Sequence, residues 1–209
     1  MSMKKLLLTS ILASSLLATT ACKKGWDISA SQRLILPVDK YSEMVEVNRP
    51  NTKTVIVKSL ELFNETSDGE TAALVLDALS GTKSGMSADV IKYYLKSVKR
   101  KNSVKHNLFV HATYNGDKRN YSSAMDEDSK KLNFELISSD NLECTVMFTN
   151  QTCTVNENIS VELSDVYLKS KSANGVEVEI SDKYGDSIYL NLPADYIKAH
   201  LSKLSAEGK

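Results

Sequence analysis

Two cysteines near the middle of the chain have the spacing of a disulfide bond across a β-hairpin. Cys144 and Cys153 lie in the string ECTVMFTNQTCTV, in which two Thr- and Val-rich runs flank a turn at Thr149-Asn150. Such runs predict a hairpin, and a loop at residues 147–150 places the two cysteines opposite each other, within reach of a disulfide. Two free buried thiols are the alternative. A metal site is disfavoured because it needs more than two soft ligands.

Basic side chains cluster between residues 92 and 105. Lys92, Lys96 and Arg100 recur every fourth residue, and Lys99 is close by. Apolar residues between them follow an amphipathic spacing, which predicts a helix over residues 88–100 with its cations facing outward. We take Lys92, Lys96, Lys99 and Arg100 as a candidate surface for an acidic partner or for anionic headgroups. Stabilisation of the helix C-terminus by these cations is the local alternative.

The other chemistry-bearing residues match no common catalytic motif. The chain lacks a GxxxxGK[ST] loop, a GxSxG elbow and an HExxH pair. His106 and His111 are five residues apart on a predicted strand and therefore face opposite sides. His200 lies on the apolar stripe of a predicted helix, and the acidic run at 126–128 meets only part of a calcium-loop pattern. We predict no catalytic residue, metal or cofactor. An enzyme remains open if folding brings Asp, His and Ser together in one cleft.

The N-terminus has the pattern of an export signal. Residues 1–22 read MSMKKLLLTSILASSLLATTAC, with two early lysines and no charge from residue 6 to residue 21. A short apolar run of this kind that ends in small residues predicts a cleaved signal peptide over residues 1–21. A membrane anchor is the alternative, but Lys23 and Lys24 end the run before it reaches the roughly 20 residues needed to cross a bilayer.

The end of this segment, Ala21-Cys22 after Thr19-Thr20, resembles the lipobox of bacterial lipoprotein precursors. It departs from that pattern at Thr19, where the family usually has Leu. The resemblance implies acylation of Cys22 after cleavage, which would leave residues 22–33 as a tether between the lipid and the folded body. Lys23 rather than Asp follows the cysteine, which in this family implies the outer membrane. Cleavage by ordinary signal peptidase after Ala21 is the alternative.

Composition supports an ordinary globular body over residues 34–209. The 209-residue chain has 26 basic and 26 acidic residues, and 42% of its residues are hydrophobic. These are values of a soluble domain, and zero net charge argues against a nucleic-acid partner. We expect strands at 34–38, 44–47 and 54–63, and then a helical pair at 67–81 and 88–100. Antiparallel hairpins follow, including one at Asn115-Gly116 and a strand at 166–169, and a last helix begins at Pro193. The predicted fold is α+β: an antiparallel sheet with an inserted helical pair and a C-terminal helix.

Together these features predict a non-catalytic outer-membrane lipoprotein that faces the periplasm. Its lipid anchor would hold it at the membrane, and it would bind or assemble with other components of the cell envelope, most simply an envelope protein. The alternative is an anchored periplasmic immunity protein or inhibitor that blocks a toxin or a hydrolase.

Overall fold

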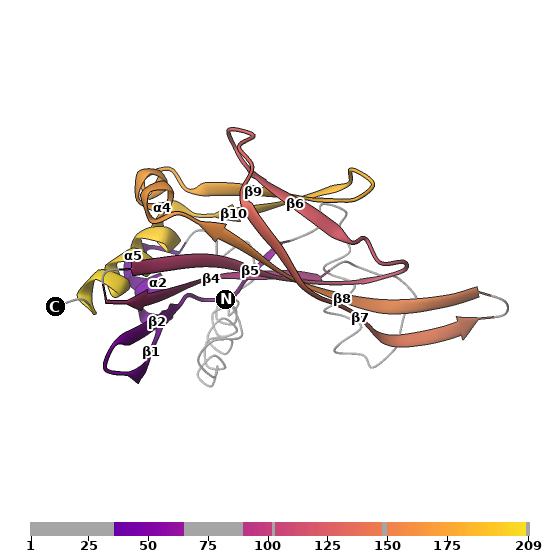
Figure 1. The fold of residues 1–209 in the computed structure, drawn as a ribbon, viewed down its shortest axis with the longest axis horizontal. Helices are drawn as coiled ribbons and strands as arrows, with labels where there is room; N and C mark the ends of the chain where they lie inside the picture. The colour runs from indigo at the N-terminus through magenta and orange to yellow at the C-terminus, as the bar shows by residue number, and fades with distance from the viewer. Residues whose placement is uncertain (1–35, 65–89, 102, 148–149, 208–209) are drawn as a thin grey trace, which may run out of the picture.

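Antiparallel strands dominate the computed structural model, which describes residues 36–64, 90–101, 103–147 and 150–207 (Figure 1). A seven-stranded sheet has the order β1-β2-β4-β5-β8-β7, with β3 also paired to β4. Its strands are β1 (Glu46–Asn51), β2 (Thr54–Lys58), β3 (Leu62–Asn64), β4 (Val90–Arg100), β5 (Ser103–Asn115), β7 (Asn133–Met147) and β8 (Asn150–Leu163).

A smaller sheet of three strands lies against one side of the large one (Figure 1). Its order is β10-β9-β6, all antiparallel, with β6 (Tyr121–Asp126), β9 (Val176–Asp182) and β10 (Ser187–Leu192). The helices are α2 (Val38–Glu43), α4 (Asp165–Lys171) and α5 (Ala194–Ala206), and they gather at one end of the two sheets (Figure 1).

The core lies between the two sheets and α5. Alternate residues of β4, β5 and β8 are buried there against β9, β10 and the helix, so one face of the large sheet points inward and the other outward. Buried tyrosines join the layers: the Tyr93 hydroxyl of β4 donates to the Asn191 carbonyl of β10 at 2.9 Å. The Tyr196 hydroxyl of α5 donates to the Leu60 carbonyl and accepts from the Leu95 amide.

The antiparallel sheet and the C-terminal helix are confirmed. Helix α5 begins directly after Pro193, which occupies the N-cap position, and buries Tyr196, Ile197 and His200 on the apolar stripe expected from the sequence. Proline suits this position because the first turn of a helix has no partner for its backbone N–H groups.

The second helix of the predicted pair is wrong: residues 90–100 form strand β4. A four-residue spacing is close to one helical turn of 3.6 residues and is twice the two-residue strand repeat, so Lys92, Lys96 and Arg100 share a face in either structure. The neighbouring residues of VIKYYLKSVKR are mostly β-branched or aromatic, which favours a strand. Strand β4 turns into β5 through Lys101, whose φ of 51° fits a tight hairpin turn. The first predicted helix, at 67–81, lies outside the described residues.

Three other local predictions are also wrong. The described part of the strand predicted at 34–38 is not a strand, because Val38 begins helix α2, and residues 166–169 belong to helix α4, whose first turn is capped by the Ser164 hydroxyl. After Asn115-Gly116 the chain does not fold back beside β5. It crosses to the smaller sheet, where β6 pairs with β9. A turn motif specifies the local backbone, but not which strand will become the neighbour.

Candidate functional site

Two of the four predicted basic residues lie over aromatic rings on the outward face of the large sheet. Lys92 and Lys96 lie on this face of β4, and Arg100 ends the strand on the same side. Lys99 does not belong with them, because it lies out of phase and lines a separate cleft beside α4 and α5. Lys58 of β2 joins the group instead, directly opposite Lys96 in the sheet. The sequence offered no signal for Lys58, because this neighbour is set by strand pairing.

The three lysines lie over aromatic rings from the same face. The Lys58 ammonium is 4.6 Å from the ring centre of Tyr94, and that of Lys96 is 5.5 Å from Phe109. Lys92 lies 5.4 Å from the ring of Phe63. Contacts of this kind contribute about 0.5–1 kcal/mol each at exposed sites. They hold the ammonium groups near fixed positions on the sheet.

Stacking extends this group of rings across β4 and β5. Tyr94 stacks on Phe109 with ring centres 5.5 Å apart, and His111 stacks on Tyr94 at 5.8 Å. Burial raises the pKa of Tyr94, and Glu61 adds to the shift. We call Lys58, Lys92, Lys96, Phe63, Tyr94 and Phe109 the basic aromatic face.

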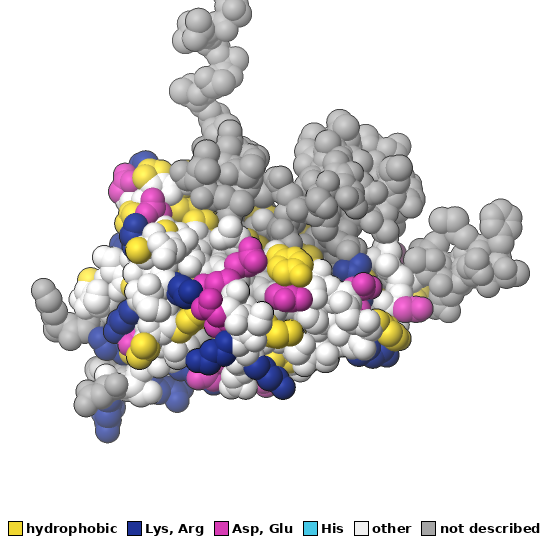
Figure 2. Space-filling model, turned by 90° about the horizontal axis from the view of Figure 1, so that it is seen from above, with side chains coloured by type: hydrophobic (Ala, Val, Ile, Leu, Met, Phe, Trp, Pro, Cys, Tyr) yellow, Lys and Arg dark blue, Asp and Glu magenta, His cyan; other side chains and the backbone are white. Residues whose placement is uncertain are grey.

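Charge differs between the two outer surfaces of the protein. Farther across the large sheet, Lys105 is paired with Glu162 at 3.0 Å, so the charges of these two side chains compensate each other. On the smaller sheet, β9 directs Glu177 and Glu179 outward, and acidic side chains gather near the middle of that side (Figure 2). An acidic ligand would therefore meet its complement at Lys58, Lys92 and Lys96 rather than on the smaller sheet.

The two histidines of β5 face opposite sides of the large sheet, as predicted. His106 is fully buried on the inward face of β5, whereas His111 lies on the outward face, where it hydrogen-bonds Asn158. His200 is fully buried on α5. In the view onto the smaller sheet no histidine is visible among the described residues (Figure 2).

A chain of buried polar side chains links both core histidines to two serines and an aspartate. Ser59 Oγ lies 2.6 Å from His200 Nδ1, and His200 Nε2 lies 2.6 Å from Ser97 Oγ. Ser97 Oγ also contacts His106 Nδ1, and His106 Nε2 lies 3.2 Å from Asp165 Oδ1. These five residues come from β4, β5, α4, α5 and the segment after β2. We call them the serine–histidine chain.

One arrangement of protons satisfies every contact in this chain. A carboxylate can only accept, so His106 Nε2–H donates to Asp165 and His106 Nδ1 must accept from the Ser97 hydroxyl. Ser97 Oγ then accepts from His200 Nε2–H, and His200 Nδ1 accepts from the Ser59 hydroxyl. Both imidazoles are neutral in this arrangement, and no buried donor or acceptor of the five is left without a partner.

The serine–histidine chain contains the residue types of a hydrolytic triad, but a substrate cannot reach its serine hydroxyl groups. Ser97, His106 and His200 are each 0% exposed, and the Ser97 hydroxyl lies between two imidazole rings. A substrate carbonyl cannot approach that oxygen, and a nucleophile needs such an approach. Burial lowers the pKa of His200 to about 3, with a further contribution from His106. Burial also lowers the pKa of His106, although Asp165 opposes this shift. The geometry fits a polar element of the core.

The acidic run at 126–128 closes a turn. Asp126 Oδ1 accepts from the backbone N–H groups of Asp128 and Lys130, at 3.1 and 2.8 Å. The Glu127 carboxylate pairs with Lys171 and accepts a hydrogen bond from the Tyr167 hydroxyl. Within the described ranges no three His, Cys, Asp or Glu side chains are grouped so that they could hold a metal ion.

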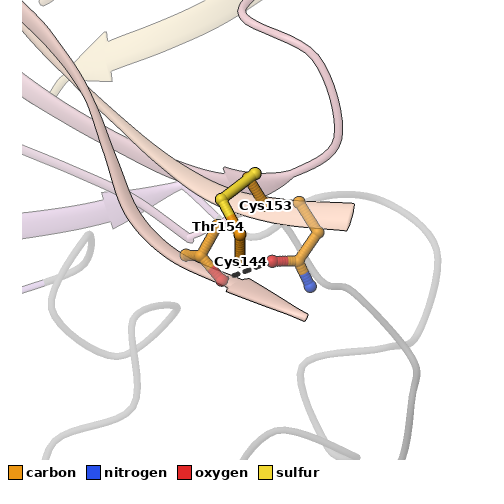
Figure 3. The surroundings of a disulfide bond; sticks show 4 residues. Cys144, Cys153 and Thr154 are labelled. Carbon is orange, nitrogen blue, oxygen red and sulfur yellow. Dashed lines mark hydrogen bonds between the residues drawn. A yellow bond between two sulfur atoms is a disulfide. The ribbon is translucent and has the colours of Figure 1, made fainter. Parts of the chain in front are cut away.

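The disulfide between Cys144 and Cys153 is confirmed (Figure 3). The two residues lie directly opposite each other on β7 and β8, with their Cα atoms 3.9 Å apart. Next to it, the Thr154 hydroxyl donates to the Asn115 side chain at 2.8 Å, which ties the base of the hairpin to the end of β5.

The remaining predicted site residue, Cys22, lies outside the described residues, as do the signal peptide and the tether. Among the residues that the structure does describe, no helix is long and apolar enough to span a bilayer. Compared with models of protein families, with curated proteins and with solved structures, the chain gives no match.

Proposed function

We propose that this protein is a lipid-anchored, non-catalytic component of the bacterial outer membrane that binds an acidic envelope protein through its basic aromatic face. Cys22 would carry the lipid, and residues 22–33 would connect it to the folded body on the periplasmic side. Three acyl chains at about 0.8 kcal/mol per buried methylene would hold the protein firmly at the membrane.

The observation that carries the binding proposal is the placement of three lysines over aromatic rings on one sheet face. The ammonium groups of Lys58, Lys92 and Lys96 project from adjacent strands of a rigid sheet, and their contacts with rings restrict their positions. Within the described part of the chain none of the three forms a salt bridge, whereas Lys105 on the same sheet does. Cations held in place lose little conformational freedom when they meet a carboxylate, and this favours binding.

A charge reversal on this face tests the proposal. The variant is Lys58→Glu/Lys92→Glu/Lys96→Glu, and the matched control reverses three exposed lysines in turns elsewhere: Lys53, Lys130 and Lys183. Both are produced as the full chain in cells, with a photo-crosslinking residue at Val98 on the outward face of β4. We expect a crosslinked adduct with wild type and control, and a several-fold weaker adduct with the face variant, because the attraction changes sign.

Stability is measured in parallel, because the face variant loses three contacts between a lysine and an aromatic ring, each worth about 0.5–1 kcal/mol, and adducts are compared only under conditions in which all three proteins are folded. Equal adducts in all three proteins would contradict the binding proposal. Binding of purified protein to phosphatidylglycerol vesicles, lost in the face variant and without any protein adduct in cells, would assign the face to membrane headgroups instead. The lipid anchor is tested separately, by the release of a Cys22 variant from membranes. The anchor proposal and the binding proposal can therefore be refuted independently of each other.

A further inference from the structure

The two imidazoles of the serine–histidine chain have different neighbours. His106 Nε2 lies 3.2 Å from the carboxylate of Asp165, whose side chain is 36% exposed at the start of α4. Among the described residues, the ring nitrogens of His200 make hydrogen-bond contacts only with the hydroxyl groups of Ser59 and Ser97. A carboxylate favours the charged form of an imidazole, whereas burial without one favours the neutral form. A proton added to the chain should therefore appear as a charge on His106.

The charged groups around His106 come from α4 and from the end of β4. Burial lowers the pKa of His106, Asp165 opposes this shift and Lys169 adds to it. Lys169 lies 2.7 Å from the Asp165 carboxylate, and Lys99 lines the same cleft. The facing position of β8 is a leucine. On α5, the ring of His200 is centred 6.3 Å from that of His106, which disfavours a charge on both imidazoles at once.

A charged His106 cannot keep the hydrogen bonds of the neutral chain. Both nitrogens of an imidazolium are donors, so Nδ1–H must donate to Ser97 Oγ, from which Nδ1 accepts when the ring is neutral. Within the described part of the chain, Ser97 Oγ makes side-chain contacts with the two imidazoles alone. The hydrogen of Ser97 must therefore turn to His200 Nε2, and this nitrogen has to become an acceptor.

The change continues through His200 to the other end of the chain. A neutral imidazole carries one hydrogen, so His200 becomes the Nδ1–H tautomer and donates to Ser59 Oγ, 2.6 Å away. The Ser59 hydroxyl then donates to the Tyr196 hydroxyl, which is within its reach. Tyr196 already donates to the Leu60 carbonyl and accepts from the Leu95 amide. A hydroxyl oxygen accepts two hydrogen bonds, so one place remains for Ser59.

Buried phenols surround the Ser59 end of the chain. Burial raises the pKa of Tyr196, although hydrogen bonds from the Leu95 amide and the Ser59 side chain oppose part of the rise. Tyr41 and Tyr93 lie near Tyr196, and burial raises the pKa of each to about 12. All three phenols stay neutral in acid, so the carboxylate at the opposite end decides which imidazole takes the charge.

We propose that the serine–histidine chain is an acid-sensitive switch, in which one proton charges His106 and reverses the hydrogen bonds from His106 to Ser59. The hydrogen of the Ser97 hydroxyl passes to His106 Nδ1, and that of His200 Nε2 passes to Ser97 Oγ. The hydrogen of the Ser59 hydroxyl passes to His200 Nδ1. The added proton comes from water and completes the Ser59 hydroxyl, which now donates to Tyr196. Each O–H or N–H bond that breaks is replaced across the same hydrogen bond, and the net charge of the chain rises by one.

The switch changes how α4 is held to the sheet. In the neutral form a neutral imidazole donates to Asp165, and in the charged form an imidazolium does, so the contact becomes an ion pair. The cleft that Lys99, Asp165 and Lys169 line then has one more positive charge beside it. The proposal does not depend on the basic aromatic face, because Ser97 is buried on the inward side of β4.

Nitrogen-15 NMR of the full chain, purified in detergent and labelled at histidine, tests the proposal. The ring shifts distinguish the Nε2–H tautomer, the Nδ1–H tautomer and the charged ring. The chain has three histidines, and His106→Gln, His111→Gln and His200→Gln assign their signals. At pH 8 we expect the Nε2–H tautomer for His106 and His200. As the pH falls, His106 becomes charged, and His200 changes to the Nδ1–H tautomer with the same midpoint while it stays neutral.

A pair of variants at Ser97 tests the link between the two rings. Ser97→Ala removes the hydroxyl, so His106 should titrate without a change of tautomer at His200. Ser97→Thr is the matched control, because it keeps a hydroxyl, and it should keep the two changes at one midpoint.

Two variants on α4 keep the test decisive if Ser97→Ala does not fold. Asp165→Asn removes the favourable charge and should lower the midpoint of His106 by about one pH unit, whereas Lys169→Gln should raise it. The tautomer change at His200 should move with His106 in both variants. The proposal is overturned if His200 becomes charged before His106, keeps its tautomer when His106 is charged, or changes at an independent midpoint. It is also overturned if the wild type unfolds before His106 titrates, because the folded protein then has no such switch.

Discussion

Mild acid should destabilise this protein through His200. Burial lowers the pKa of His200 to about 3 in the folded chain, whereas an unfolded histidine titrates near about 6.5. The unfolded chain therefore binds a proton that the folded chain excludes. Because the folded-state pKa is the lower one, the stability that His200 contributes is complete above pH 6.5 and is lost as the pH falls from there towards 3.

The size of the effect follows from proton linkage. Each pH unit between the two pKa values lowers the free energy of unfolding by about 1.4 kcal/mol per proton. Between pH 7 and pH 5, only the interval below the unfolded-state pKa of about 6.5 contributes, which is about 1.5 pH units. His200 alone therefore lowers the free energy of unfolding by about 2 kcal/mol. His106 adds to the loss, because burial lowers its pKa as well. The Lys169 ammonium holds the pKa of Asp165 low. This carboxylate therefore affects the pH dependence of stability mainly below pH 5.

Urea unfolding at pH 7 and pH 5, at constant ionic strength, measures this difference. His200→Gln removes the titrating group, so it should lose about 2 kcal/mol less between the two pH values, whatever its absolute stability. His111→Gln is the matched control, because it makes the same substitution on the outward face, away from the serine–histidine chain. A wild type that loses less than about 0.5 kcal/mol, or a His200→Gln variant that loses as much as wild type, refutes the reasoning.

Three further outcomes are expected. Cys144→Ser/Cys153→Ser opens a loop of about ten residues and should lower the free energy of unfolding by up to about 2–3 kcal/mol, measured by urea unfolding against wild type; full labelling of both thiols in the unreduced wild type would contradict the disulfide itself. Glu157→Leu removes a buried carboxylate that accepts from Tyr114, Asn120 and Ser139, and the unpaired donors should cost about 1–3 kcal/mol each. An unchanged melting temperature would show that these contacts contribute nothing net. Cys22→Ser should leave the chain unprocessed or release it from membranes, and mass spectrometry that finds an unmodified cysteine at the mature N-terminus would rule out lipidation.

Local patterns were sufficient where the deciding interactions are close in sequence. The cysteine hairpin needs only its turn and its two β-prone arms, and both cysteines lie within ten residues of each other. The last helix needs only Pro193 and an apolar stripe. Patterns failed where one spacing suits two structures: Lys92, Lys96 and Arg100 lie on one face of a helix or of a strand, so their spacing could not tell the two apart.

The pairing of distant strands decided which residues form the basic aromatic face and the serine–histidine chain. Lys58 reaches the basic aromatic face because β2 pairs with β4, and Lys99 leaves it because its strand position points inward. Ser59 and His200 are separated by 141 positions in the chain, yet they hydrogen-bond in the core. The physical reason is that a residue's local preferences involve its own backbone and its near neighbours. Which strand lies beside which depends on the burial of apolar area summed over the whole chain.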